Sequence, residues 1–161
     1  MTRHALLLLL LFVGSPAWAQ TPRGAQHLSA TQLRDTVAGA ARAQTGMAGA
    51  LLADRGSYTV LVLRRDQTGE VEIHDAWDDV FVVQEGMGTL LLGGTVTGDR
   101  VTAPGERRGG RISGGGSQTL VAGDVMVIPA KTPHQVQVPA GGSITYLVIK
   151  TPSAGTSPPR P

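Results

Sequence analysis

The sequence predicts an all-β fold, an antiparallel sandwich or barrel with one short helix before it. Two observations predict this fold class. From residue 58 to residue 150, short runs rich in valine, leucine and isoleucine recur at intervals of about ten residues, as the strands of such folds do. Turn residues separate these runs, and helical patterns do not, which favours antiparallel pairing over a mixed α/β arrangement.

An apolar run near the start of the chain predicts export. Ala5 to Val13 follows Arg3 and precedes Ala17-Trp18-Ala19, which is the pattern of a secretory signal peptide. The run is too short to span a bilayer as a helix. We therefore expect residues 1–19 to be cleaved off after Ala19. The mature protein is then periplasmic or secreted, with no membrane association after processing.

The composition limits the functions of the mature chain. There is no cysteine, so disulfide bonds and thiol chemistry are excluded. Without Arg3, 13 basic residues stand against 12 acidic ones, and this near-neutral balance predicts no nucleic-acid partner. The four remaining aromatic residues are too few for a base-stacking surface. These are Tyr58, Trp77, Phe81 and Tyr146.

The segments at the two ends of the predicted domain differ from its strands. Residues 20–28 form a polar, flexible lead-in. A helix is predicted over residues 29–46, because Ser29 and Gln32 have capping-box spacing and Gly46 is a suitable residue after the helix end. The proline- and serine-rich residues 151–161 are expected to be a disordered tail.

The strands are placed by their apolar residues and their turns. Asp66 to Gly69 is a turn that leads into residues 70–74, and the apolar runs at 80–83 and 89–92 flank Glu85-Gly86, which predicts a hairpin. Further strands are expected at 58–63, 120–121, 125–128, 135–138 and 144–149. Central packing is assigned to Val80, Phe81, Val83, Val127, Ile128, Leu147 and Ile149.

Two stretches about fifty residues apart carry polar residues and glycines in a motif-like spacing. The first holds Gly69, Glu72, His74, Asp79 and Gly86, and the second holds Gly123, Pro129 and His134. They resemble the two signature motifs of the cupin superfamily, which read roughly G-x5-H-x-H-x3-4-E-x6-G and G-x5-P-x-G-x2-H-x3-N. Glu72 stands in place of the first His and Asp79 in place of the Glu, while Lys131 replaces the inner Gly and Val138 the final Asn.

The resemblance covers roughly residues 56–150 and implies a fold. That fold is a cupin-like antiparallel β-barrel, also called a double-stranded β-helix or jelly roll. The chain is similar to secreted, bacterial-type single-domain cupins of the type-2-like kind. Such domains often pair through their sheets, so the resemblance implies a homodimer.

The motif residues predict a metal site. Glu72 and His74 are two apart, so a strand directs both side chains to one face. Asp79 would add a carboxylate from the next strand, and His134 would close the set from the second motif. Two imidazoles and two carboxylates suit Mn, Fe, Ni or Zn. Asp79 is one methylene shorter than the family's Glu, so Asp78 remains the alternative ligand.

The ordinary interpretation of each histidine alone is a surface or structural role. Apart from His27, however, His74 and His134 are the only histidines of the mature chain, and both stand at motif spacing. This favours a shared inward site. The glycine-rich segment 93–123 is interpreted as a solvated loop; the alternative is that its four charges between Glu106 and Arg111 line an entrance for an acidic ligand.

Three functions are compatible with these features. The first is a metal-dependent enzyme on a small organic substrate, for which the resemblance implies oxygenase, isomerase, lyase or decarboxylase chemistry. The second is a non-catalytic secreted module that binds a small ligand or a metal. The third is a structural barrel with a relic site. Buried carboxylates need compensating charge, and a metal cation is the simplest source, which favours the first function.

Overall fold

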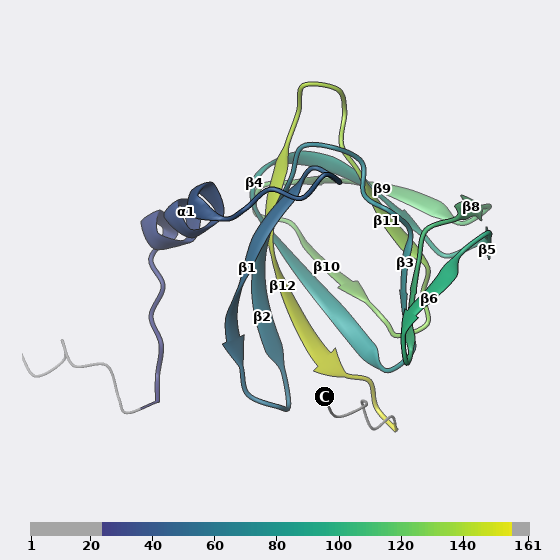
Figure 1. Ribbon diagram of the computed structural model, residues 1–161, viewed down its shortest axis with the longest axis horizontal. Helices are drawn as coiled ribbons and strands as arrows, with labels where there is room; N and C mark the ends of the chain where they lie inside the picture. The colour runs from purple at the N-terminus through teal and green to yellow at the C-terminus, as the bar shows by residue number, and fades with distance from the viewer. Residues whose placement is uncertain (1–23, 156–161) are drawn as a thin grey trace, which may run out of the picture.

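The structure is a computed structural model that describes residues 24–155. The predicted signal peptide and residues 156–161 of the predicted tail lie outside the described residues. Within them, one helix precedes a large antiparallel sheet that curls into an open barrel (Figure 1). The predicted all-β class with one short N-terminal helix is confirmed. Among the described residues, no helix has the length and apolar character needed to cross a bilayer.

The elements follow one another in this order. The helix is α1 (Ala30–Gly39), and the strands are β1 (Met47–Asp54), β2 (Thr59–Arg65), β3 (Glu72–His74), β4 (Trp77–Leu92), β5 (Thr95–Thr97), β6 (Arg100–Ala103), β7 (Glu106–Arg108), β8 (Arg111–Ser113), β9 (Gly116–Val121), β10 (Val125–Ile128), β11 (His134–Gln137) and β12 (Ile144–Pro152). The main sheet has the order β1-β2-β12-β4-β11-β3-β7-β6, with β9 and β10 also paired to β4. β5 and β8 form a separate two-stranded sheet.

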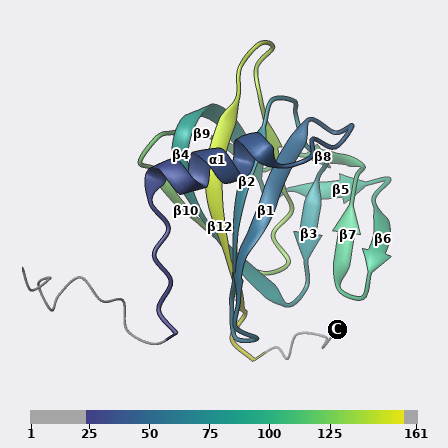
Figure 2. The same ribbon diagram turned by 60° about the vertical axis from the view of Figure 1, so that its left-hand side comes forward.

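The helix begins as predicted and ends earlier. Ser29 Oγ accepts a hydrogen bond from the Gln32 N–H, and Gln32 Oε1 accepts one from the Ser29 N–H, which is the predicted capping box. The helix stops at Gly39, and the chain enters β1 at Met47. Figure 2 shows α1 lying across β1 and β2, which agrees with its contacts.

The barrel therefore starts before residue 56. β1 pairs with β2 over its whole length, from Met47 opposite Arg65 to Asp54 opposite Thr59. Its sequence, MAGALLAD, has no β-branched residue, so local propensity gave no strand signal. Pairing with the β-branched β2 overrides that weak propensity. The barrel also ends later than predicted, because β12 includes Thr151 and Pro152.

The predicted hairpin at residues 80–92 is wrong, because β4 is one strand of 16 residues. Gly86 has a φ of 76°, and a Cβ at this position would collide with the Ser143 carbonyl oxygen. The register with β12 shifts close by, between Thr145, opposite Glu85, and Tyr146, opposite Val83. Such a bulge bends a strand without ending it. The first half of β4 pairs with β10 and β12, and the second half with β9 and β11.

The core lies on the inner face of the barrel. Phe81, Val83 and Ile128 belong to it as predicted. Val127, however, is 61% exposed, because alternate residues of a strand face opposite sides. Val80, Leu147 and Ile149 are only half-buried for the same reason. The inner cluster consists of Phe81, Val83, Leu90, Leu120, Ile128, Val136, Val138, Ile144, Tyr146 and Val148.

Candidate functional site

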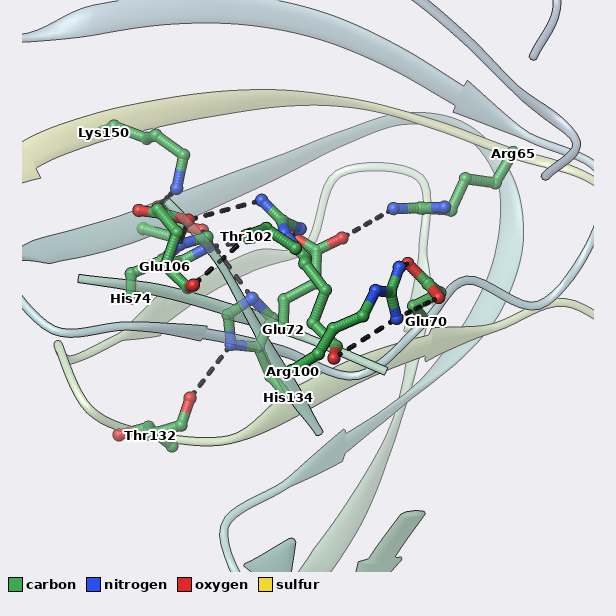
Figure 3. A network of polar contacts seen from close by, with 12 residues as sticks. Arg65, Glu70, Glu72, His74, Arg100, Thr102, Glu106, Thr132, His134 and Lys150 are labelled. Carbon is green, nitrogen blue, oxygen red and sulfur yellow. Dashed lines mark hydrogen bonds and ion pairs between the residues drawn. The ribbon is translucent and has the colours of Figure 1, made fainter. Parts of the chain in front are cut away.

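Three strands bring the two motifs together inside the barrel. Glu72 and His74 lie at the two ends of β3, and Asp79 lies in the first half of β4. His134 begins β11 and is paired directly with Glu72 across the sheet. The two imidazole rings have centroids 5.3 Å apart. All four predicted residues therefore meet in one place (Figure 3 labels three of them).

The two histidines are held by their Nδ1 atoms. Nδ1 of His74 lies 2.6 Å from Glu106 Oε2, and Nδ1 of His134 lies 3.0 Å from the Thr132 carbonyl oxygen. A carbonyl and an ionised carboxylate can only accept, so each Nδ1 carries the donated proton. Each ring thereby directs its Nε2 into the interior. This is how metal-ligating histidines are usually oriented.

The two Nε2 atoms are buried without a hydrogen-bond partner among the described residues. Both rings are 2% exposed. Nε2 of His74 lies 3.3 Å from Asp79 Oδ2, but not in hydrogen-bonding geometry. Buried polar atoms without partners are uncommon in proteins. The pair fits a shared ligand, since Glu72, His74 and His134 offer ligand atoms that all lie within 4.8 Å of one another.

The direction of the side chains separates the two candidate aspartates. Asp79 is buried, and its Oδ2 also lies 3.8 Å from His134 Nε2. Asp78 Oδ1 instead accepts a hydrogen bond from the Ala130 N–H at 2.7 Å. Asp78 thus fixes the turn before His134, and Asp79 is the carboxylate that faces both imidazoles.

Sequence reasoning missed the basic residues of the site. Arg65 Nη2 donates to Glu72 Oε1 at 2.8 Å, and Arg108 pairs with Glu72 Oε2. Lys150 Nζ lies 2.6 Å from Asp79 Oδ1. With Glu106, three carboxylates therefore face three basic side chains. These ion pairs compensate the buried carboxylates, so a metal cation is not the simplest source of that charge as the sequence suggested.

The interpretation of the glycine-rich segment as a solvated loop is also wrong for two of its charges. β7 pairs with β3, which places Arg108 opposite Glu72 and Glu106 opposite His74. Both side chains are partly buried as a result. Glu106 and Arg108 stand two apart, as Glu72 and His74 do, with complementary chemistry. This equal spacing of ionisable residues in the two segments was the sequence signal that could have predicted their pairing.

The surroundings set the protonation of the site. Burial lowers the pKa of His74, but the carboxylates of Asp79, Glu106 and Glu72 outweigh it and raise the pKa to about 10. Burial lowers the pKa of His134, and its bond to Thr132 opposes this only in part. Burial raises the pKa of Glu72, yet His74 and Arg108 bring it well below its usual value. Glu72 is therefore ionised, and His134 is neutral.

Comparison with known proteins places the fold but not the activity. No protein-family model and no curated protein matches the sequence. Among solved structures, the chain resembles an uncharacterised double-stranded β-helix protein from Klebsiella pneumoniae, with a TM-score of 0.57, 12% identity, and coverage of 82% of this chain and 94% of that one. It also resembles KdgF from Halomonas sp., with a TM-score of 0.52, 16% identity, and coverage of 70% and 86%.

A third similar structure is Pac13, a nucleoside dehydratase, with a TM-score of 0.51, 15% identity, and coverage of 73% of this chain and 80% of that one. At these identities the likeness establishes the fold alone. The protein has the cupin-like double-stranded β-helix fold that its motifs predicted, and proteins of this fold include enzymes.

Proposed function

We propose that the protein is a small cupin that binds one divalent metal ion through His74 and His134, with Glu72 and Asp79 as carboxylate ligands, and acts on a small organic substrate. One observation carries the proposal. Both histidines donate through Nδ1 and leave a buried Nε2 that has no hydrogen-bond partner among the described residues and lies within 4 Å of the carboxylate of Asp79. Mn, Fe, Ni and Zn all suit such a mixed nitrogen and oxygen set.

A bound metal would polarise a carbonyl or enolate oxygen of the substrate. The protein's own residues supply the other requirements. Glu106 and the Thr132 carbonyl keep the two imidazoles in place. Lys150 Nζ donates a hydrogen bond to Asp79 Oδ1 at 2.6 Å, which places an ammonium donor in the cavity lining. Of the oxygenase, isomerase, lyase and decarboxylase classes, isomerase and lyase chemistry needs such a proton donor most directly.

Thermal melts with added metal test this proposal. A ligand that binds only the folded state stabilises it by about 2.7 kcal/mol at 100 times its Kd. We expect Mn, Fe, Ni or Zn to raise the melting temperature of chelator-treated protein, and Mg to do so much less because it prefers an all-oxygen shell. If no transition metal raised the melting temperature, the metal-dependent function would be wrong.

A second candidate is a non-catalytic module that binds a small ligand without metal. The charge balance favours it, because Arg65, Arg108 and Lys150 already neutralise the three carboxylates. This module would bind its ligand equally well before and after chelator treatment. The metal-dependent site would lose binding after chelation and regain it with metal.

We further propose that the protein is exported and is periplasmic or secreted. The support is the signal-peptide pattern that ends at Ala17-Trp18-Ala19. The intact mass of protein recovered from the producing organism tests this. A mature chain that begins at Gln20 supports export, and retention of Met1 to Ala19 would contradict it.

We also propose that two copies pair through the outer face of the sheet. Supporting this are the exposed valines of β10, Val125 and Val127, both 61% exposed, since large apolar surfaces often mark interfaces. Light scattering should give a dimer mass for the wild type and a monomer mass for Val125→Glu, Val127→Glu. A monomeric wild type would exclude the dimer.

A further inference from the structure

The lining of the cavity at the site has two chemically different parts. Its volume is about 220 Å³, and Glu72, Asp79 and His134 belong to the polar part of its lining. The apolar part of the lining comes from β2, β4 and β12, the strands that also carry Arg65, Asp79 and Lys150, with Met47 from β1. The apolar side chains on these three strands include Leu61, Leu63, Phe81 and Val148. A molecule that fills the cavity must therefore have both a polar and an apolar part.

Among the residues that line the cavity, basic side chains outnumber carboxylates by one, although Glu106 also pairs with Arg108 from outside the lining. Arg65, Arg108 and Lys150 line the cavity, but only Glu72 and Asp79 oppose them there. Glu106, the third carboxylate, is not part of the lining. Its Oε2 lies 2.6 Å from Nδ1 of His74, behind the ring. A metal ion would add further positive charge, so the cavity attracts an anion in either state.

Two of the three basic side chains remain accessible. Arg108 and Lys150 are 29% and 22% exposed, whereas Arg65 is 6% exposed and is held by both Tyr146 and Glu72. A neighbouring hollow of about 290 Å³ shares Arg108 with the cavity and contains the exposed Arg100. This hollow also contains Glu70, which pairs with Arg100 at 3.0 Å, so Arg108 is the guanidinium group that both spaces share and that remains accessible.

We propose that the ligand is a small organic carboxylate with a short apolar tail, an inference that rests on the function proposed above. The carboxylate contacts Arg108 and Lys150. The tail lies against Leu61, Phe81 and Val148. At about 30 Å³ for each water-sized group, the cavity holds roughly seven such groups. Two of these groups are the carboxylate oxygens, so the size corresponds to a monocarboxylic acid of about five or six carbons and is too small for a nucleotide.

Isothermal titration calorimetry with straight-chain carboxylates from propanoate to octanoate tests the proposal. Metal-loaded and chelator-treated protein are titrated in parallel. One buried methylene is worth about 0.8 kcal/mol, so affinity should rise about fourfold per methylene and then stop rising once the cavity is full. Hexanamide and hexylamine, which keep the tail but lack the negative charge, should bind at least tenfold more weakly than hexanoate.

Substitutions of single residues test which basic side chains bind the carboxylate of the ligand. Arg108→Gln should weaken hexanoate at least tenfold while changing hexanamide little, and Lys150→Met should act in the same direction. Arg107→Gln is the matched control, because Arg107 is the next residue along β7 and pairs with Asp99 outside the cavity. It should leave both affinities unchanged. The wild-type chain-length series remains decisive if a variant fails to fold.

The outcomes distinguish this proposal from the metal-dependent function. A protein that holds metal but binds hexanoate and hexanamide equally, or neither, would overturn the carboxylate proposal and leave the metal site intact. Affinity that does not change with tail length would overturn it as well. A protein that holds no metal yet shows the carboxylate and tail preferences would support the ligand class and contradict the metal-dependent function.

Discussion

Two adjacent strands at the site, β3 and β11, hold histidines of equal burial in different electrostatic surroundings. On the β3 side, carboxylates surround His74, and its pKa is raised to about 10. On the β11 side, His134 has a backbone carbonyl at Nδ1 and the edge of Phe81 beside its ring, 6.2 Å between centroids. Burial lowers the pKa of His134. Burial alone therefore does not fix the charge of an imidazole, because neighbouring carboxylates can reverse its effect.

This difference assigns different tasks to the two rings. In the proposed site, the lowered pKa of His134 favours the neutral ring that a metal requires. His74 holds a proton in the metal-free protein, and a metal must displace it. The following predictions test this contrast.

The largest expected effect is on the pH dependence of stability. The proton of His74 stabilises the metal-free fold fully below pH 6.5, and this contribution is lost as the pH rises through about 10. At about 1.4 kcal/mol per pH unit, the loss amounts to several kcal/mol. The neutral ring of His134 acts in the opposite sense, because its pKa is lowered: its contribution is present above pH 6.5 and is lost as the pH falls.

Melting curves of chelator-treated protein from about pH 5 to pH 10 measure both effects. His74→Gln should remove most of the alkaline loss, and His134→Gln should remove part of the acid loss. An alkaline loss that is the same in wild type and His74→Gln would show that His74 is not the proton-holding ring.

The next effect concerns packing on the β11 side. Phe81 is buried between His134 and Tyr146, with a centroid distance of 4.8 Å to the Tyr146 ring. Phe81→Ala should lower the free energy of unfolding by about 3–5 kcal/mol. Val101→Ala, at a site 72% exposed, should change it by less than about 0.5 kcal/mol. Equal effects of the two changes in urea denaturation would mean that Phe81 does not support this wall.

A smaller effect is expected on the β3 side, in metal affinity. Glu106→Gln removes the charge that orients His74 and should weaken metal binding about 10- to 100-fold. Thr132→Ala should have no such effect, because the acceptor for His134 is the backbone carbonyl. Glu70→Gln is the control, since Glu70 is an exposed partner of Arg100. Competition with a chromophoric chelator gives the metal affinities. A Glu106→Gln variant that binds metal as tightly as the wild type would contradict the role of Glu106 in positioning His74.

The smallest expected effect is on stability and concerns Lys131, whose backbone links the segment before β11 to β3. Lys131 has a φ of 66°, and its N–H donates to the His74 carbonyl at 2.7 Å. The left-handed conformation costs a non-glycine residue about 1–2 kcal/mol. Lys131→Gly should therefore raise the free energy of unfolding by up to about 1 kcal/mol without changing metal affinity. Destabilisation by this change would show that the Lys131 side chain has a role of its own.

The sequence predicted the parts of the site that depend on local pattern. Residue parity placed Glu72 and His74 on one face of a strand, and motif spacing located His134. Arg65 and Lys150 could not be found in this way. Their inward direction follows from the parity of β2 and β12, and their partners come from strands seven and 71 residues away in the sequence.

The class of the fold was predicted, and two of the errors in its elements have the same cause. β1 lacks β-branched residues, and the bend of β4 at Gly86 resembles a turn in local sequence. Both segments are decided by pairing with strands that are distant in the sequence. Local propensity is a weak guide where such pairing dominates.

The central claim is that His74 and His134 hold one metal ion between them. The most direct test is the metal content of protein purified without a histidine tag or chelator, compared with the His74→Ala, His134→Ala double variant prepared in the same way. A folded double variant, verified by circular dichroism, should contain almost no transition metal, whereas the wild type should contain about one ion per chain. Equal metal content in the two proteins would contradict the site.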